Sequence, residues 1–158
     1  MILTILAAGF HFLALGIGLG ALFARALHFR GLRRPGSDKR GELKSLFLSN
    51  YYWGLAAHLW LITGLLRLFG GVEKTTAFYF HNPFFYIKMA LFTLLFALEI
   101  LPMVTVLKWK KQSRQNGKFP VSKGKLGLFI RLNDMELALL VIIPFVAAAM
   151  ARGVWLMP

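Results

Sequence analysis

Several ionisable side chains lie inside stretches of sequence that are otherwise almost wholly apolar, among them His11, His58, Arg67, Lys88 and Glu99. An ionisable group is costly to place in lipid, so each of them is a candidate functional residue. A histidine there can ligate haem iron or transfer a proton, and a cation can neutralise an anionic ligand. The alternative is structural: a neutral histidine bonded to a neighbouring helix, or a lysine whose ammonium reaches the membrane surface.

The spacing of these residues limits which of them can meet. His58 and Arg67 are nine residues apart, so they face opposite sides of a straight helix. Lys88 and Glu99 are eleven residues apart, so they share a face at a separation of about 16 Å. His11 and His58 are expected at similar depth, which suits two axial ligands on adjacent helices. We therefore predict a haem b or other tetrapyrrole site with His11 as the iron ligand, His58 or Lys88 opposite or near it, and Arg67 and Lys88 on the propionates.

Four apolar runs are long enough to cross a bilayer as helices, because a crossing needs about 20 residues. The chain is 58% hydrophobic and 16% charged, which is too apolar for an ordinary soluble domain. It has no cysteine, so thiolate metal sites are excluded. The expected fold is a single all-α domain over residues 1–158, an integral membrane four-helix bundle. Its spans are predicted at about residues 2–24, 46–69, 84–107 and 132–154.

The basic residues predict the orientation of these spans. Fifteen of the nineteen Lys and Arg residues lie in or beside two connections, residues 25–44 and 108–131. The positive-inside rule places these connections in the cytoplasm and both termini outside, in the periplasm of a bacterial inner membrane. The net charge of +13 is explained by the membrane surface, so no nucleic-acid partner is expected.

Further polar and small residues predict contacts between the helices. Arg25 matches Glu136 in depth, so we expect either an Arg25–Glu136 or an Arg131–Glu99 pair. Asp134 is expected near the start of its helix, where the helix dipole stabilises a carboxylate. Gly16, Gly20 and Ala24 form a ridge of small residues that predicts close packing against a neighbouring helix.

The chain resembles a bacterial family of predicted membrane proteins, the domain of unknown function 2214. The resemblance covers nearly the whole chain. It rests on the stretch Thr63-Gly64-Leu65-Leu66-Arg67 with the following Glu73-Lys74, on Asn82-Pro83, Phe85 and Lys88-Met89, and on the segment around Glu136. The family implies a small helical membrane protein, and it carries no activity that can be transferred.

The chain is more distantly similar to the HemJ-type protoporphyrinogen oxidases and to copper-resistance-type membrane domains. His11, Lys88 and the group Arg131, Asn133 and Glu136 stand at the matching positions. Asn133 and Glu136 are not adjacent here, although the corresponding residues are adjacent in the HemJ type. This similarity implies tetrapyrrole binding rather than porphyrinogen oxidation itself.

Three functions remain open at this point, and whether the protein is an enzyme is one of the open questions. The first is a tetrapyrrole-binding membrane protein in a redox role. The second is a non-enzymatic accessory or assembly subunit, with a homo-oligomer or a membrane-protein partner. The third is a proton or small-solute pathway that uses Lys88 and Glu99 in an oligomer. A hydrolase or kinase has no support, because the sequence has neither a nucleophile elbow nor a Gly-rich phosphate loop.

The haem hypothesis predicts a coloured protein. The detergent-purified chain, made in cells well supplied with haem, should show a Soret band that shifts when dithionite reduces the air-oxidised sample. The band should be absent from His11→Ala, because that change removes the predicted iron ligand. A colourless wild-type protein would contradict haem binding.

Overall fold

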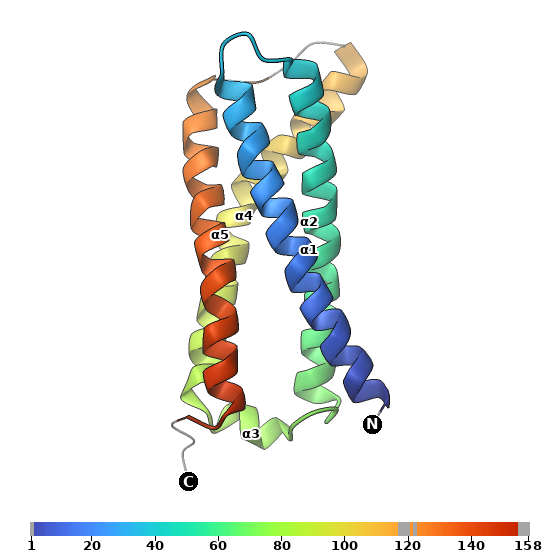
Figure 1. The fold of residues 1–158 in the computed structure, drawn as a ribbon, viewed down its shortest axis with the longest axis vertical. Helices are drawn as coiled ribbons and strands as arrows, with labels where there is room; N and C mark the ends of the chain where they lie inside the picture. The colour runs from blue at the N-terminus through green and yellow to red at the C-terminus, as the bar shows by residue number, and fades with distance from the viewer. Residues whose placement is uncertain (1, 117–120, 122, 155–158) are drawn as a thin grey trace.

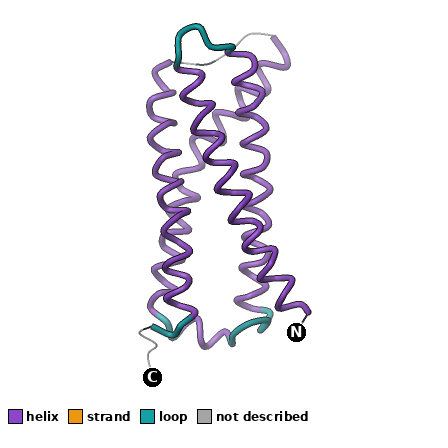
Figure 2. The backbone as a smooth tube through the Cα atoms, viewed as in Figure 1, coloured by secondary structure: helices purple, strands orange, loops and turns teal. Residues whose placement is uncertain are grey.

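The computed structural model describes residues 2–116, 121 and 123–154, which form four long helices and one short helix. The long helices are α1 (Ile2–Arg33), α2 (Lys39–Phe69), α4 (Pro83–Asn116) and α5 (Lys123–Ala151), and the short one is α3 (Thr76–Phe80). The long helices run side by side and alternate in direction, while α3 lies across one end (Figure 1). The described residues contain no strand (Figure 2), so the all-α prediction is confirmed.

Local capping groups determine where the helices begin. The Asp38 carboxylate accepts a hydrogen bond from the Arg40 N–H at the start of α2, and Gly36 takes the positive φ of 74° that the preceding turn requires. Thr75 caps α3 in the same way, by accepting from the Phe78 N–H. Asn82 accepts from the Phe84 N–H at the start of α4, where Pro83 occupies the first helical position.

Three of the described helices are long and apolar enough to cross a membrane: Ile2–Arg33, Pro83–Gln115 and Gly124–Ala151. These correspond to the first, third and fourth predicted spans. The second predicted span, within α2, is less hydrophobic than the other three. Asn50 and His58 are polar, and Tyr51 and Tyr52 prefer the membrane interface to its hydrocarbon centre. Their presence lowers the mean hydropathy of α2, although the helix itself forms as predicted.

The helices extend beyond the predicted spans at the end that carries the basic connections. α1 continues to Arg33, α2 begins at Lys39, and α4 continues to Asn116. Residues 108–116 and 123–131 of the second basic connection are therefore helical, and residues 117–120 and 122 lie outside the described part of the chain. Lys, Arg and Gln favour helix, and their side chains can be solvated where a helix leaves the lipid.

The interior is divided into layers along the long axis. One apolar cluster at the basic end includes Phe29, Trp109 and Phe129, and a central cluster includes Leu22, Trp53, Trp60, Leu95 and Leu140. A smaller cluster of Tyr79, Phe85 and Met150 closes the opposite end, next to α3. Polar groups lie between the first two layers, and a cavity lies between the second and third.

At two positions of the predicted ridge on α1, Gly16 and Gly20, no other helix of this chain comes close to the backbone. A side chain at Gly16 or Gly20 would meet nothing within 4 Å, whereas one at Gly18 would meet the Trp53 ring at 3.2 Å. The close approach of α1 to α2 therefore depends on Gly18, which lies on the opposite side of the helix from the ridge. Within the chain, the packing prediction for Gly16 and Gly20 was wrong.

Gly18→Leu should lower the stability of the folded protein by about 1–3 kcal/mol, because the new side chain would overlap the buried Trp53 ring. The matched change Gly16→Leu should stay within about 0.5 kcal/mol of the wild type, since it faces open space. Thermal unfolding in one detergent measures both. Equal losses in the two variants would contradict this assignment of the helix contact.

Candidate functional site

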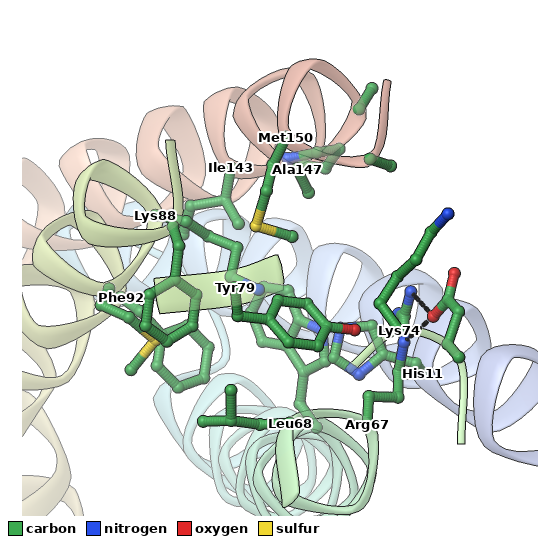
Figure 3. Close-up of a pocket in the computed structure, with 18 of the residues that line it drawn as sticks. His11, Arg67, Leu68, Lys74, Tyr79, Lys88, Phe92, Ile143, Ala147 and Met150 are labelled. Atoms are coloured by element: carbon green, nitrogen blue, oxygen red, sulfur yellow. Dashed lines mark hydrogen bonds and ion pairs between the residues drawn. The ribbon is translucent and has the colours of Figure 1, made fainter. Parts of the chain in front are cut away.

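A cavity of about 310 Å³ lies at the α3 end of the molecule and is lined by all five helices. Figure 3 shows His11, Arg67, Tyr79 and Lys88 around it, together with Ile143, Ala147 and Met150 from α5. Its walls are mainly apolar, and its charged groups are few: Arg67, Glu73, Lys74 and Lys88. This combination is typical of a site for a small molecule with an apolar body and a charged group.

Helical spacing explains how these side chains converge. Trp60 and Arg67 are seven residues apart on α2, which places both on its inward face. Lys88 and Phe92 are one turn apart on α4, and both line the cavity. Ala147 and Ala148 on α5 have short side chains that leave the space open. The cavity therefore results from small residues on α5 facing large ones on α2 and α4.

His11 is held by hydrogen bonds to α2 through both ring nitrogens. Its Nε2 accepts from the Trp60 indole N–H at 2.9 Å, and its Nδ1 lies 2.8 Å from Thr63 Oγ1. Because an indole N–H can only donate, Nε2 is unprotonated, and Nδ1 of the neutral ring donates to Thr63. The Thr63 hydroxyl donates in turn to the Leu59 carbonyl at 2.7 Å. This geometry matches a neutral histidine that joins α1 to α2.

With these hydrogen bonds in place, His11 has no free lone pair for an axially bound haem iron. An iron bound at Nε2 would need the lone pair that accepts from Trp60. His58, the second predicted ligand, is exposed on the outer face of α2, where its Nδ1 lies 2.7 Å from the Gly54 carbonyl. The opposite placement of His58 and Arg67 therefore agrees with their nine-residue spacing. Among the described residues, no three His, Asp or Glu side chains are grouped to hold a metal ion.

Arg67 is an ion-paired cation at the cavity wall. Its guanidinium binds the Glu73 carboxylate, which lies in the turn between α2 and α3. The Lys74 ammonium lies 5.2 Å from the centre of the Phe78 ring. The Tyr79 phenol is buried, and this burial raises its pKa above the ordinary value; Glu73 adds to the increase and Arg67 opposes it. Tyr79 is therefore a neutral hydroxyl beside the ion pair.

Lys88 differs from Arg67 in having no acidic side chain within ion-pair distance in the described part of the chain. Its ammonium lies over the face of the Phe85 ring, 5.7 Å from the ring centre. Lys88 is largely enclosed and lines the cavity. A cation in such a place is stabilised by an anion, and the cavity is where an anion can approach it.

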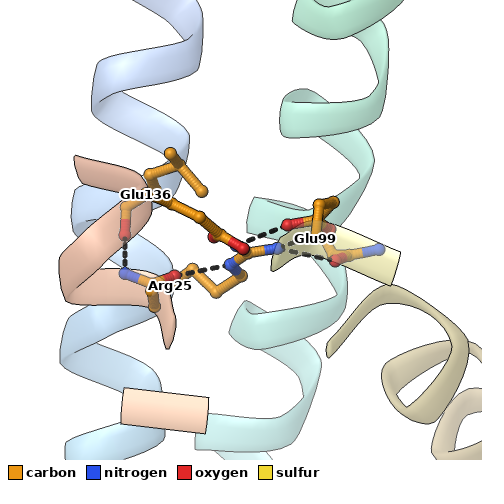
Figure 4. Close-up of polar contacts among 6 residues, drawn as sticks. Arg25, Glu99 and Glu136 are labelled. Carbon is orange, nitrogen blue, oxygen red and sulfur yellow. Dashed lines mark hydrogen bonds and ion pairs between the residues drawn. The ribbon is translucent and has the colours of Figure 1, made fainter. Parts of the chain in front are cut away.

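A second polar centre lies between the apolar layers, about two helical turns from the cavity along α4. Arg25 there binds the carboxylates of Glu99 and Glu136 and the amide oxygen of Asn133 (Figure 4). The Arg25–Glu136 pair was one of the two pairings expected from the sequence. The other, Arg131–Glu99, is wrong, because Arg131 is exposed and Arg25 occupies Glu99.

Asp134 also differs from its prediction. α5 begins at Lys123, so Asp134 lies in the fourth turn of the helix, too far from its start for the helix dipole to stabilise it. Its carboxylate instead accepts two hydrogen bonds from Arg30 of α1, at 2.7 and 2.8 Å, on an exposed face. The apolar run begins at about residue 132, nine residues after the helix does, so the run alone places Asp134 near the helix start, whereas the helix starts further back in the sequence.

Three residues of the cavity were not singled out for a role from the sequence: Trp60 as the donor to His11, Glu73 as the partner of Arg67, and Tyr79. The acidic Glu73, six residues after an arginine, was the available signal for the ion pair. Trp60 and Tyr79 gave no separate signal, because aromatic residues are frequent at membrane interfaces and in cores. His11, Arg67 and Lys88 are brought together as predicted, and His58 is not.

The chain matches a known family over residues 3–155, described as "Predicted membrane protein (DUF2214)". No curated protein and no solved structure matches it. The match covers every helix of the cavity and of the second polar centre.

Proposed function

The chain belongs to the DUF2214 family of predicted membrane proteins, and from that premise we propose a four-span protein of the bacterial inner membrane. It binds an amphipathic anion, with a carboxylate or phosphate group and an apolar body, in the cavity beside Lys88. The spans are the four long helices. Both termini and α3 lie on the periplasmic side, and the basic connections lie in the cytoplasm.

The outer face of α2 supports its place in the lipid. α2 has 31 residues, which at about 1.5 Å each exceeds a hydrocarbon thickness of about 30 Å. Apart from His58, its large exposed side chains over the last four turns are apolar: Leu55, Leu61, Ile62, Leu65, Leu66 and Phe69. A continuous apolar face of this kind is more stable in contact with lipid than in contact with water. The polar residues that lower its hydropathy lie mainly in its first half.

Charge supports the orientation. The turn between α1 and α2 and the facing ends of α4 and α5 are at one end of the molecule (Figure 1), and they carry most of the basic residues. The opposite end carries Arg67, Lys74, Lys88 and Arg152, of which Arg67 is ion-paired. A cytoplasmic leaflet rich in anionic lipid attracts the more basic end.

The topology can be tested with single cysteines, because the natural chain has none. Ala77→Cys, on the exposed face of α3, should react in intact spheroplasts with a membrane-impermeant maleimide. Pro35→Cys, exposed between α1 and α2, should react only after the membrane is opened. The reverse pattern would invert the proposed orientation. If both positions react before the membrane is opened, they lie on the same side of it, and α2 does not cross the membrane.

The observation that carries the ligand proposal is the half-buried ammonium of Lys88 on an apolar cavity wall, with no acidic partner among the described residues. A ligand carboxylate or phosphate there would form a charge-assisted hydrogen bond in a poorly solvated place, where such bonds are strong. The apolar residues Phe12, Leu65 and Met89 at the cavity edge suit the ligand body. A porphyrin propionate has this chemistry too, but iron ligation by His11 is not required and stays a separate prediction.

The other predicted functions receive less support. Phe92 and the fully buried Leu95 lie between Lys88 and Glu99 on the same face of α4, so an apolar layer interrupts the predicted proton or solute pathway. A homo-oligomer or a membrane-protein partner stays a prediction. The binding role proposed here is non-enzymatic and is compatible with either.

Binding can be measured by quenching of Trp60, which lines the cavity. A dibrominated long-chain fatty acid should quench the protein in phosphatidylcholine nanodiscs, and its methyl ester should not quench at the same concentration. Lys88→Met should weaken fatty-acid binding roughly 10- to 100-fold, because a hydrogen bond to a charged group contributes about 1.5–3 kcal/mol.

The matched control is Lys44→Met, which removes an exposed lysine at the opposite end and should leave binding unchanged. Trp60→Phe should abolish the quenching signal and so locate it. If phosphatidylglycerol in the nanodisc competes with the fatty acid, the natural ligand is a membrane lipid rather than a free acid. Equal binding of acid and ester, in the wild type and in Lys88→Met, would refute the anion site.

A further inference from the structure

The polar centre between the apolar layers contains more negative than positive charge. Its charged side chains are Arg25 of α1, Glu99 of α4 and Glu136 of α5, with relative exposures of 0%, 4% and 0%. α2 contributes the neutral Asn50 amide, 3.4 Å from Arg25 Nη1, and α5 also contributes the neutral Asn133. With both glutamates ionised, the centre would hold one uncompensated negative charge.

An uncompensated charge in this position is strongly disfavoured. Apolar layers containing Phe29 and Phe129 on one side and Leu22 and Leu140 on the other enclose the centre. Two carboxylates that share such a site do not both ionise, because they repel each other and neither is hydrated. The least costly way to remove the charge is to keep one proton on the pair.

The hydrogen bonds indicate which carboxyl group keeps the proton. Glu99 receives two parallel bonds from Arg25, from Nη1 at 2.8 Å and from Nη2 at 2.7 Å, which is the arrangement that best stabilises an ionised carboxylate. Glu136 contacts Arg25 through Oε2 alone, and its buried Oε1 has no hydrogen-bond partner. An unpartnered oxygen is far less costly on a neutral acid than on a carboxylate.

Arg25 cannot give up its own proton to balance the charge, because a guanidinium stays protonated in proteins. Its third nitrogen is engaged as well, because Nε donates a hydrogen bond to Asn133 Oδ1 at 2.6 Å. The Asn133 side chain is held in place by the hydrogen bond that its Nδ2 donates to the Leu22 carbonyl at 3.0 Å. The guanidinium is thereby aimed at Glu99, and Glu136 is left with a contact through one oxygen.

We propose that the Arg25–Glu99–Glu136 centre is a proton-binding site that holds one proton on Glu136 at neutral pH, separate from the ligand cavity. Loss of this proton would place a negative charge between α1, α4 and α5, where these helices meet. The protonated state is therefore the one in which the three helices pack as described.

Infrared spectroscopy of the protein in nanodiscs tests this at neutral pH, because a protonated carboxyl group has a C=O stretch distinct from that of a carboxylate. The wild type should show one such band from a buried acid. Glu136→Gln should lose it entirely. Glu99→Gln should lose it as well, because Glu136 would then be the sole counter-ion of Arg25 and would ionise.

Asp134→Asn is the matched control, because it removes an exposed, ion-paired carboxylate two residues before Glu136 and should leave the band unchanged. Glu136→Gln should unfold at or above the wild-type temperature, since glutamine has the shape of the protonated acid. Absence of the band from the folded wild type, or its persistence in Glu136→Gln, would overturn the proposal. A band that appears only when sodium is replaced by choline would show a metal-cation site instead.

Discussion

The buried guanidinium of Arg25 is the interaction on which the arrangement of the helices depends. It binds side chains of α4 and α5 while its own backbone belongs to α1, and it reaches Asn50 of α2 at longer distance. A charge this deep cannot be left unpaired, so these helices have to meet at this level and in this register. Apolar packing alone would permit many sliding positions, since lipid and leucine are equally apolar.

The rest of the molecule follows from that register. On one side of the centre, the helices close over an aromatic layer that includes Trp109 and Phe129. On the other side, the central layer of Leu22, Leu95 and Leu140 separates the buried charges from the cavity. The cavity remains open because α5 presents alanines there. The short helix α3 then closes the end, with Tyr79 packed against Phe85 and Met150.

The two polar regions are electrostatic opposites, which argues for different roles. The centre has an excess of carboxylates, and its three charged side chains are buried. The cavity has an excess of cations, because Glu73 balances Arg67 and leaves Lys88 without a counter-ion. α4 carries Lys88 in the cavity and Glu99 in the centre, with Leu95 between them. The helix therefore separates the two regions by an apolar residue, and it also connects them as one rigid element. Binding in one would therefore alter the other through movement of the helices that contribute to both, α1, α4 and α5.

The sequence by itself determined the helical class, the apolar runs and the family, because these depend on composition and on local order along the chain. Helical spacing also separated His58 from Arg67 correctly. Only the tertiary structure decided the partners: that Arg25 takes both glutamates, that Trp60 and Thr63 saturate His11, and that Gly18 rather than Gly16 meets Trp53. Spacing fixes which face a residue occupies on its own helix. It does not fix how neighbouring helices are rotated and shifted, and a hydrogen bond depends on both helices at once.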